Sequence, residues 1–133
     1  MRDENMPYFD PEAVENLREI VTQTSAGIVI TSSWREKGIH IMEDVWYSRK
    51  MPGILEGITP SDIHSYFCIR GSQILQWLSA QDDQNYNYVI IDDCNDFLPE
   101  QMSKLVRTNP HFGLTKQDAA KAIAILQGSS PEQ

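Results

Sequence analysis

The chain has 133 residues with 19 acidic and 11 basic side chains, which give it a net charge of −8 at pH 7. This length allows one domain with a buried core and excludes two independent ones. The acidic balance is the reverse of the basic surface that nucleic-acid-binding proteins normally show. A polynucleotide would therefore have to be held by a local basic cluster such as Arg35, Lys37, Arg49 and Lys50.

The two cysteines, Cys68 and Cys94, are too few for a disulfide framework and lack the spacing of a zinc site. The segment 1–9 is charged and has no apolar signal region. Nowhere does the chain contain the run of about 18 apolar residues that a membrane helix needs. These features predict a cytoplasmic protein that does not interact with a membrane.

The first half of the chain alternates between helix and strand. Asp10 and Pro11 supply an N-cap carboxylate and a proline at the first helical position, and the helix that they open ends near 24–27. The short apolar run 28–30 predicts a buried strand. Apolar residues at helical spacing predict a second helix over 39–50.

The second half begins with the segment 54–69, in which the apolar pattern fades. This predicts a loop or a small cap-like excursion with one short helical turn. A helix led by an arginine follows over 70–78, and the continuous apolar run 88–91 predicts the central strand. The pair 105–106 is a weak strand candidate, and a capping box opens a last helix over 115–126.

This alternation favours the α/β class, with a doubly wound and mostly parallel sheet. The number of strands is low for that class. We expect one domain over 1–133, with an irregular N-terminus at 1–9 and a frayed tail at 128–133.

The central strand runs directly into two adjacent carboxylates, Asp92 and Asp93, and a third, Asp96, follows closely. Open α/β sheets bind ligands at the carboxyl ends of their strands. Two carboxylates a few ångströms apart repel each other by roughly 4 kcal/mol at an effective dielectric constant of about 20. A divalent cation bound by these three residues would relieve that repulsion, so the sequence predicts a metal site here. The alternative interpretation is a solvated turn, in which aspartate is a common residue.

Polar residues also follow the strand at 28–30, in the order Thr31, Ser32 and Ser33, with Arg35 close behind. In phosphoryl transfer a hydroxyl can bind a phosphate oxygen, and a cation such as Arg70 can neutralise developing charge. Ser33 and Arg35 are candidates for binding the substrate phosphate. The alternatives are that the hydroxyls cap the next helix, that Arg35 braces the turn, and that Arg70 pairs with a surface acid.

Five segments follow one another along the chain: GIVITSSWR at 27–35, GITP at 57–60, RGSQILQWL at 70–78, YVIIDDCND at 88–96, and the glycine and leucine at 113–114. In this order they resemble the phosphatase-type domains linked to RNA repair systems, a subfamily of the haloacid dehalogenase-like (HAD) superfamily of phosphohydrolases. The resemblance covers roughly 9–126 and implies a Rossmann-like sheet.

The resemblance also implies roles for individual residues. Thr31 or Ser32 would be the hydroxyl that holds the transferring phosphoryl group, and the choice between them stays open. Arg70 would be the cation, at a position where many relatives have lysine. Asp92 and Asp93 would hold Mg²⁺, with Asp96 as a supporting acid.

The first motif of the superfamily has no counterpart in this chain. That motif is DxD followed by glycine at the end of a first strand, and its leading aspartate is the nucleophile. The segment 1–9 has neither an apolar run nor a DxD sequence. Either the numbered start is internal to a longer native chain, or another chain supplies the strand, or the domain has lost its chemistry and repacked.

The expected function is therefore Mg²⁺-dependent hydrolysis of a phosphate ester, on a phosphorylated small molecule or a nucleic-acid end. As this chain the domain is expected to be inactive, because the nucleophile motif is missing. The alternative is a catalytically dead HAD-like module that serves in binding or interaction. A homodimer that completes its sheet across two chains is a further possibility.

Overall fold

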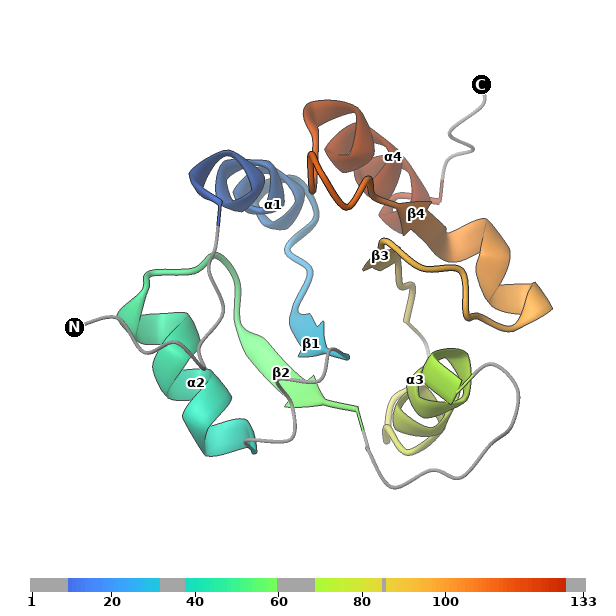
Figure 1. The fold of residues 1–133 in the computed structure, drawn as a ribbon. Helices are drawn as coiled ribbons and strands as arrows, with labels where there is room; N and C mark the ends of the chain where they lie inside the picture. The colour runs from blue at the N-terminus through green and yellow to red at the C-terminus, as the bar shows by residue number, and fades with distance from the viewer. Residues whose placement is uncertain (1–9, 32–37, 60–68, 85, 129–133) are drawn as a thin grey trace.

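The computed structural model describes residues 10–31, 38–59, 69–84 and 86–128. Helices and short strands alternate along the chain (Figure 1). The elements are α1 (Pro11–Thr24), β1 (Ile28–Ile30), α2 (Ile39–Ser48), β2 (Leu55–Ile58), α3 (Ile69–Ser79), β3 (Ile90–Asp92), the 3-10 helix η2 (Pro99–Lys104), β4 (Leu105–Arg107) and α4 (Lys116–Leu126). No helix in the described ranges is long and apolar enough to cross a bilayer.

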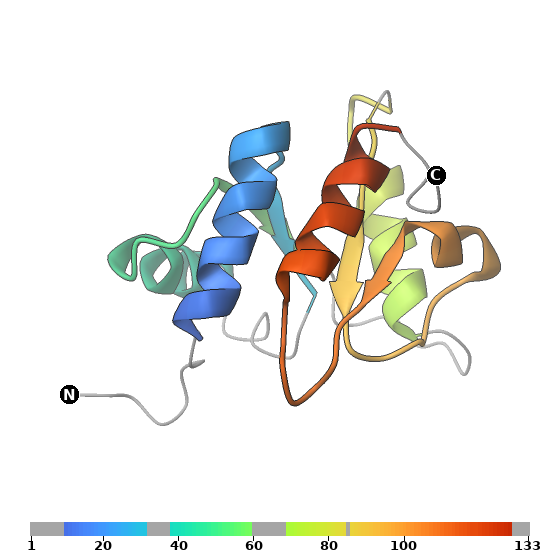
Figure 2. The same ribbon diagram turned by 90° about the horizontal axis from the view of Figure 1, so that it is seen from above.

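The strands lie between two layers of helices. β1 pairs with β2 and β3 pairs with β4, and both pairings are parallel. Helices α1 and α4 cover one face of the strands, and α2 and α3 cover the other (Figures 1 and 2). This arrangement confirms the predicted α/β class. The described strands form two separate pairs, so a single doubly wound sheet is not confirmed.

Local sequence signals account for the starts of α1 and α4. The carboxylate of Asp10 accepts the backbone N–H of Glu12 at 3.0 Å, as expected of an N-cap. The hydroxyl of Thr115 accepts the N–H of Asp118 at 3.2 Å, and the Asp118 carboxylate accepts the N–H of Thr115 at 3.0 Å. Both predicted helix starts are confirmed.

Helices α1 and α4 pack against each other across the two strand pairs. Ala119 and Ala122 of α4 are fully buried, and their small side chains allow a close approach to Ile20 of α1. The side-chain amide of Asn16, also buried, donates to the backbone carbonyl of Leu114 at 2.8 Å. The first and last helices of the described chain are therefore joined by both apolar and polar contacts.

Two further groups of buried side chains complete the core. Trp46 of α2 packs with Met42 and Met51 near the first strand pair, and its indole N–H donates to the carbonyl of Pro52 at 3.0 Å. Beside the second strand pair, α3 packs on β3 and on the loop before η2 through a cluster made of Ile74, Ile90 and Phe97.

The loop predicted over 54–69 is wrong for its first part, because residues 55–58 form β2. Glu56 and Gly57 interrupt the apolar run, so local pattern alone does not identify this strand. Pairing with β1 stabilises it, and Gly57 allows Trp77 of α3 to pack closely: a Cβ atom at Gly57 would lie 2.9 Å from the Trp77 indole nitrogen. Residues 60–68 lie outside the described residues, and so does the short helical turn predicted for this segment.

Two predicted boundaries also shift. The central strand was expected at 88–91, and it spans Ile90–Asp92, so Asp92 is its last residue. α3 begins at Ile69, which puts Arg70 in the first turn of that helix. Arg70 and Asp92 lie at the same edge of the strands, where their side chains pair at 3.0 Å.

Candidate functional site

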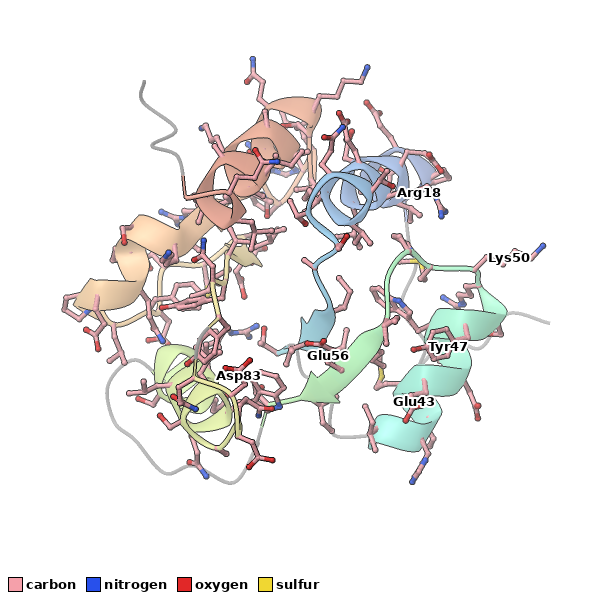
Figure 3. The ribbon with its side chains drawn as sticks, turned by 180° about the vertical axis from the view of Figure 1, so that it is seen from behind. Arg18, Glu43, Tyr47, Lys50, Glu56 and Asp83 are labelled. Carbon is pink, nitrogen blue, oxygen red and sulfur yellow. The ribbon has the colours of Figure 1, made fainter. Side chains whose placement is uncertain are left out.

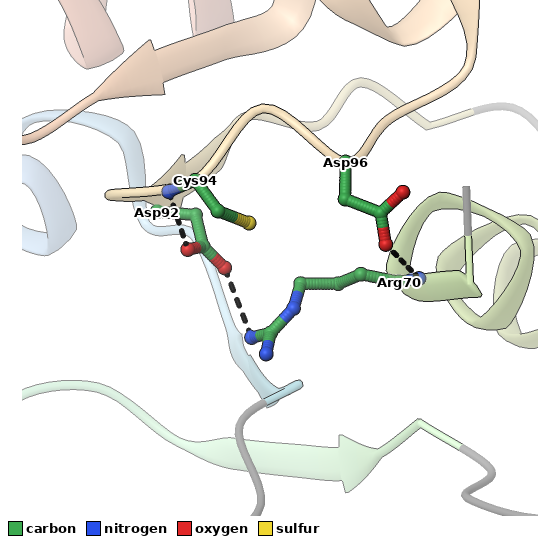
Figure 4. A network of polar contacts seen from close by, with 4 residues as sticks. All are labelled: Arg70, Asp92, Cys94 and Asp96. Carbon is green, nitrogen blue, oxygen red and sulfur yellow. Dashed lines mark hydrogen bonds and ion pairs between the residues drawn. The ribbon is translucent and has the colours of Figure 1, made fainter. Parts of the chain in front are cut away.

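The carboxyl ends of β1 and β3 lie on the same side of the molecule, because the two strands run in the same direction (Figure 2). Thr31 follows β1 and Thr59 follows β2 at this edge. Asp92 ends β3, and Arg70, in the first turn of α3, lies beside it (Figure 4). The fold therefore brings together residues that are far apart in the sequence.

Arg70 is held at both its backbone and its side chain. Its guanidinium Nη1 donates to Asp92 Oδ2 at 3.0 Å, and its backbone N–H donates to Asp96 Oδ2 at 3.2 Å (Figure 4). The other oxygen of Asp92 accepts the N–H of Cys94 at 3.1 Å. The Asp92 side chain is only 10% exposed, whereas 32% of the Arg70 side chain remains exposed. The guanidinium is thus fixed in place yet open to a ligand.

Gln101 of η2 holds the first turn of α3 through hydrogen bonds of its side-chain amide. It is 1% exposed, and its amide donates to the carbonyl of Gly71 at 2.9 Å and accepts the N–H of Leu98 at 2.9 Å. A Cβ atom at Gly71 would lie 2.5 Å from the Gln101 amide oxygen and 2.9 Å from the Leu98 nitrogen. Glycine at position 71 is therefore needed for this contact, which positions the neighbouring Arg70.

The environment of Asp92 favours its ionised form. Burial would raise the pKa of Asp92, but the hydrogen bond from the Cys94 N–H and the positive charge of Arg70 outweigh burial and lower it. Burial raises the pKa of the Cys94 thiol. The site at neutral pH therefore contains a carboxylate paired with a guanidinium, beside a neutral thiol.

This pairing predicts a loss of stability in acid. The pKa of Asp92 lies below its ordinary value of 3.8 in the folded chain, so its stabilising contribution is present above that value and is lost as the pH falls through the lower folded-state pKa. We expect the Asp92→Asn variant to be less stable at pH 7 and to show a weaker fall in Tm between about pH 4 and pH 2. Circular dichroism melts across this range would measure both effects, and an unchanged acid limb in the variant would contradict the prediction.

The three acids predicted to bind a metal are not gathered around one point. Asp92 and Asp96 both face Arg70, and the backbone carbonyl of Asp93 accepts the guanidinium Nε of Arg107 at 3.1 Å. Among the described residues, no group of three or more His, Cys, Asp and Glu side chains could hold a metal ion. Mg²⁺ needs only one or two carboxylates when phosphate oxygens complete its shell, and the ionised Asp92 suits it chemically. Magnesium at Asp92, Asp93 and Asp96 stays a prediction.

Of the predicted hydroxyl and phosphate-binding residues, only Thr31 is described, and it lies at the end of β1. Ser32, Ser33 and Arg35 lie outside the described residues, so the choice between Thr31 and Ser32 stays open.

Thr59 was not among the residues predicted for the site. It is 2% exposed, and its backbone N–H donates to the carbonyl of Ile30 at 3.0 Å. Within the described chain its buried hydroxyl has no hydrogen-bond partner, a condition that costs about 1–3 kcal/mol. The signal was the threonine of GITP, which could be recognised as the end of a strand only once β2 was known.

A cleft of about 990 Å³ opens between the two strand pairs. Thr31 and Thr59 line it, as do residues of α1, α3 and β3. The hydroxyls and the neighbouring Arg70 are the groups that could bind the oxygens of an anionic ligand at this edge.

Comparison with known proteins gives one match. The model of the family described as "HAD domain in Swiss Army Knife RNA repair proteins" matches residues 1–119. No curated protein and no solved structure matches the chain significantly. The matched range includes all four strands and every residue of the site described above.

Proposed function

The chain belongs to the family of HAD domains of Swiss Army Knife RNA repair proteins, and we propose on that basis that it is a phosphohydrolase-type domain that binds phosphate esters beside Arg70. The observation that supports this proposal best is the fixed guanidinium at the carboxyl ends of the strands. Asp92 and Asp96 orient it, and it stays partly exposed.

The geometry of Arg70 suits a phosphate group. A guanidinium carries five N–H donors and binds phosphate oxygens in pairs. Within the described residues, the ion pair with Asp92 engages Nη1 and leaves the fork open to a second acceptor. Thr31 or Ser32 would bind another phosphate oxygen, and Ser33 and Arg35 would contact the rest of the substrate.

Asp92 and Asp93, with Asp96 in support, would hold Mg²⁺ in the substrate complex. When bound, the ion would neutralise charge on the phosphate oxygens. The lowered pKa of Asp92 keeps it in the deprotonated state that a metal ligand needs. With a net charge of −8, the chain suits a nucleotide or a polynucleotide end better than a long polyanion.

The chain as numbered would bind such a substrate without cleaving it. The segment 1–9 contains no DxD sequence, so the aspartate nucleophile of the superfamily has no counterpart in residues 1–133. A catalytically dead binding module is the second candidate, and one observation favours it: the described residues contain no ready group of three metal ligands.

Calorimetric titration of the 133-residue chain with adenosine 5′-monophosphate, with and without Mg²⁺, would test the proposal. We expect binding that Mg²⁺ strengthens, and no release of phosphate from p-nitrophenyl phosphate. Binding that is indifferent to Mg²⁺ would support the dead module. Absence of nucleotide binding under both conditions would refute the phosphate site, and turnover above the blank would contradict the expected inactivity.

A further inference from the structure

A second arginine lies at the same edge of the strands as Arg70. Arg107 is the last residue of β4, and the register of the strand pair places it opposite Asp92. β3 and β4 end together on the side of the molecule where β1 also ends (Figure 2). Arg107 has no role in the phosphate site proposed above, and its position at this edge makes it a candidate for a further contact with the ligand.

The packing of β4 puts Arg107 on the same face of the strands as Arg70. Leu105 packs against the buried cluster beside α3, whereas Val106 belongs to the buried cluster beneath α1 and α4. Successive side chains of a strand point to opposite faces, so Arg107 points, like Leu105, to the face that α3 covers. The Asp92 side chain meets Arg70 of α3 on this face. The two arginines and the carboxylate therefore share one face at one edge.

The guanidinium of Arg107 is anchored through one nitrogen. Its Nε donates to the carbonyl of Asp93 at 3.1 Å, and the N–H of the next residue, Thr108, donates to the carbonyl of Asp92 at 2.9 Å. Both bonds tie the end of β4 to the turn that carries the two acids. In the part of the chain that the structure describes, the Nη atoms of Arg107 have no hydrogen-bond partner and no acidic side chain forms an ion pair with them. Their N–H groups are therefore free to bind a ligand.

The two arginines differ in charge balance and in exposure. The charge of Arg70 is paired with Asp92, whereas Arg107 is exposed and bonds only a neutral carbonyl. Their anchors, Asp92 and Asp93, are consecutive residues, whose Cα atoms lie about 3.8 Å apart. Arginine binds phosphate oxygens in pairs through its planar fork. A ligand with two phosphate groups would therefore contact both guanidiniums, whereas a single phosphate is bound by Arg70.

We propose that Arg107 is a specificity-determining residue that binds a second phosphate group, so that the site prefers nucleotides with two phosphate groups to nucleotides with one. This inference rests on the phosphate site proposed at Arg70, which would bind the first phosphate group. The competing explanation is that Arg107 only braces the turn after β3 through the carbonyl of Asp93. The two explanations differ in what a substitution of Arg107 does to ligands with one and with two phosphate groups.

Calorimetric titration of the 133-residue chain with three ligands would test the proposal. The ligands are adenosine 5′-monophosphate, adenosine 5′-diphosphate and adenosine 3′,5′-bisphosphate, at one fixed ionic strength and one Mg²⁺ concentration. We expect a ligand with two phosphate groups to bind about tenfold more tightly than the monophosphate, because hydrogen bonds to charged groups are strong enough for such a gain. A gain for the diphosphate means adjacent phosphate groups, and a gain for the bisphosphate means phosphate groups on either side of a ribose.

Three variants assign the gain to Arg107. Arg107→Gln keeps a side-chain N–H donor but removes the charge, and it should weaken the preferred ligand about tenfold more than it weakens the monophosphate. Arg107→Lys keeps the charge and should retain part of the preference. Arg18→Gln is the matched control, because the exposed guanidinium of Arg18 also donates to a backbone carbonyl, that of Lys50 at 3.4 Å, but lies on α1 (Figure 3). It should leave the preference unchanged.

The opposing outcomes separate this inference from the phosphate site itself. If Arg107→Gln weakens all three ligands by the same factor, Arg107 only braces the turn and the inference is wrong. The inference also fails, while the site at Arg70 stands, if neither ligand with two phosphate groups binds the unaltered chain more tightly than the monophosphate does. An equal loss of preference in Arg18→Gln would show that overall charge decides. If none of the three ligands binds, the phosphate site is refuted and the inference with it.

Discussion

The Gln101→Leu variant is expected to lose about 2–4 kcal/mol of unfolding free energy. Leucine has a similar size but cannot serve the carbonyl of Gly71 and the N–H of Leu98, which Gln101 bonds at 2.9 Å each. A buried backbone group left without a partner costs about 1–3 kcal/mol. Since a domain of this size has only about 5–15 kcal/mol of stability in total, urea unfolding should show a large shift of the midpoint.

Gln84→Leu is the matched control for this variant. Gln84 is exposed, although its amide also donates two hydrogen bonds, to the carbonyls of Leu78 and Gln81 at 3.1 and 2.6 Å. Water can replace these hydrogen bonds, so we expect Gln84→Leu to change the unfolding free energy by no more than about 0.5 kcal/mol. If Gln101→Leu lowers the unfolding free energy by no more than Gln84→Leu does, the Gln101 contacts do not hold α3 in place.

The second large effect concerns Arg70 and rests on the proposed phosphate site. Arg70→Ala should weaken binding of adenosine 5′-monophosphate by about 10- to 100-fold, because hydrogen bonds to charged groups contribute about 1.5–3 kcal/mol. The affinity of Arg70→Lys should lie between those of the unaltered chain and Arg70→Ala, since lysine keeps the charge but lacks the planar fork. Calorimetric titration at one fixed ionic strength would measure all three proteins.

Arg18→Ala removes the same charge at a distance from the site. Arg18 lies on α1, and its exposed guanidinium contacts Glu15 and the carbonyl of Lys50 (Figure 3). We expect its affinity for the nucleotide to change less than twofold. A loss as large as that of Arg70→Ala would show that overall charge, and not the Arg70 fork, controls binding. Unchanged affinity in Arg70→Ala would remove Arg70 from the site.

Sequence reasoning succeeded where the signal is local. The cap at Asp10 and the capping box at Thr115 place two helix starts correctly. The continuous apolar runs before Thr31 and Asp92 identify β1 and β3, because a strand covered on both faces needs no alternation.

The same reasoning failed where pairing or packing decides the structure. β2 contains Glu56 and Gly57, and it is a strand because β1 pairs with it and Trp77 packs at Gly57. The end of that strand, Thr59, was missed for the same reason. Neither contact can be deduced from residues 54–59 alone.

The candidate site was predicted in composition and only partly in arrangement. Asp92 was expected at a strand end and Arg70 at the start of a helix, and the structure shows that they pair at 3.0 Å. From the sequence, pairing with a surface acid is as good an explanation of Arg70 as a catalytic role. The sequence does not reveal which carboxylate lies within reach of Arg70 after folding. The geometry of the acids around a metal likewise depends on backbone directions in the turn after β3.

The packing of α1 against α4 has a consequence for the order of events during synthesis. Asn16 bonds to Leu114 across a separation of 98 residues, and Ile20 packs with Ala122. A ribosome releases α1 well before α4, so α1 lacks this partner until α4 has also emerged. Contacts between residues this distant in sequence slow folding, and the apolar face of α1 stays exposed to solvent in the meantime. We therefore expect the nascent chain to depend on chaperones until α4 is complete.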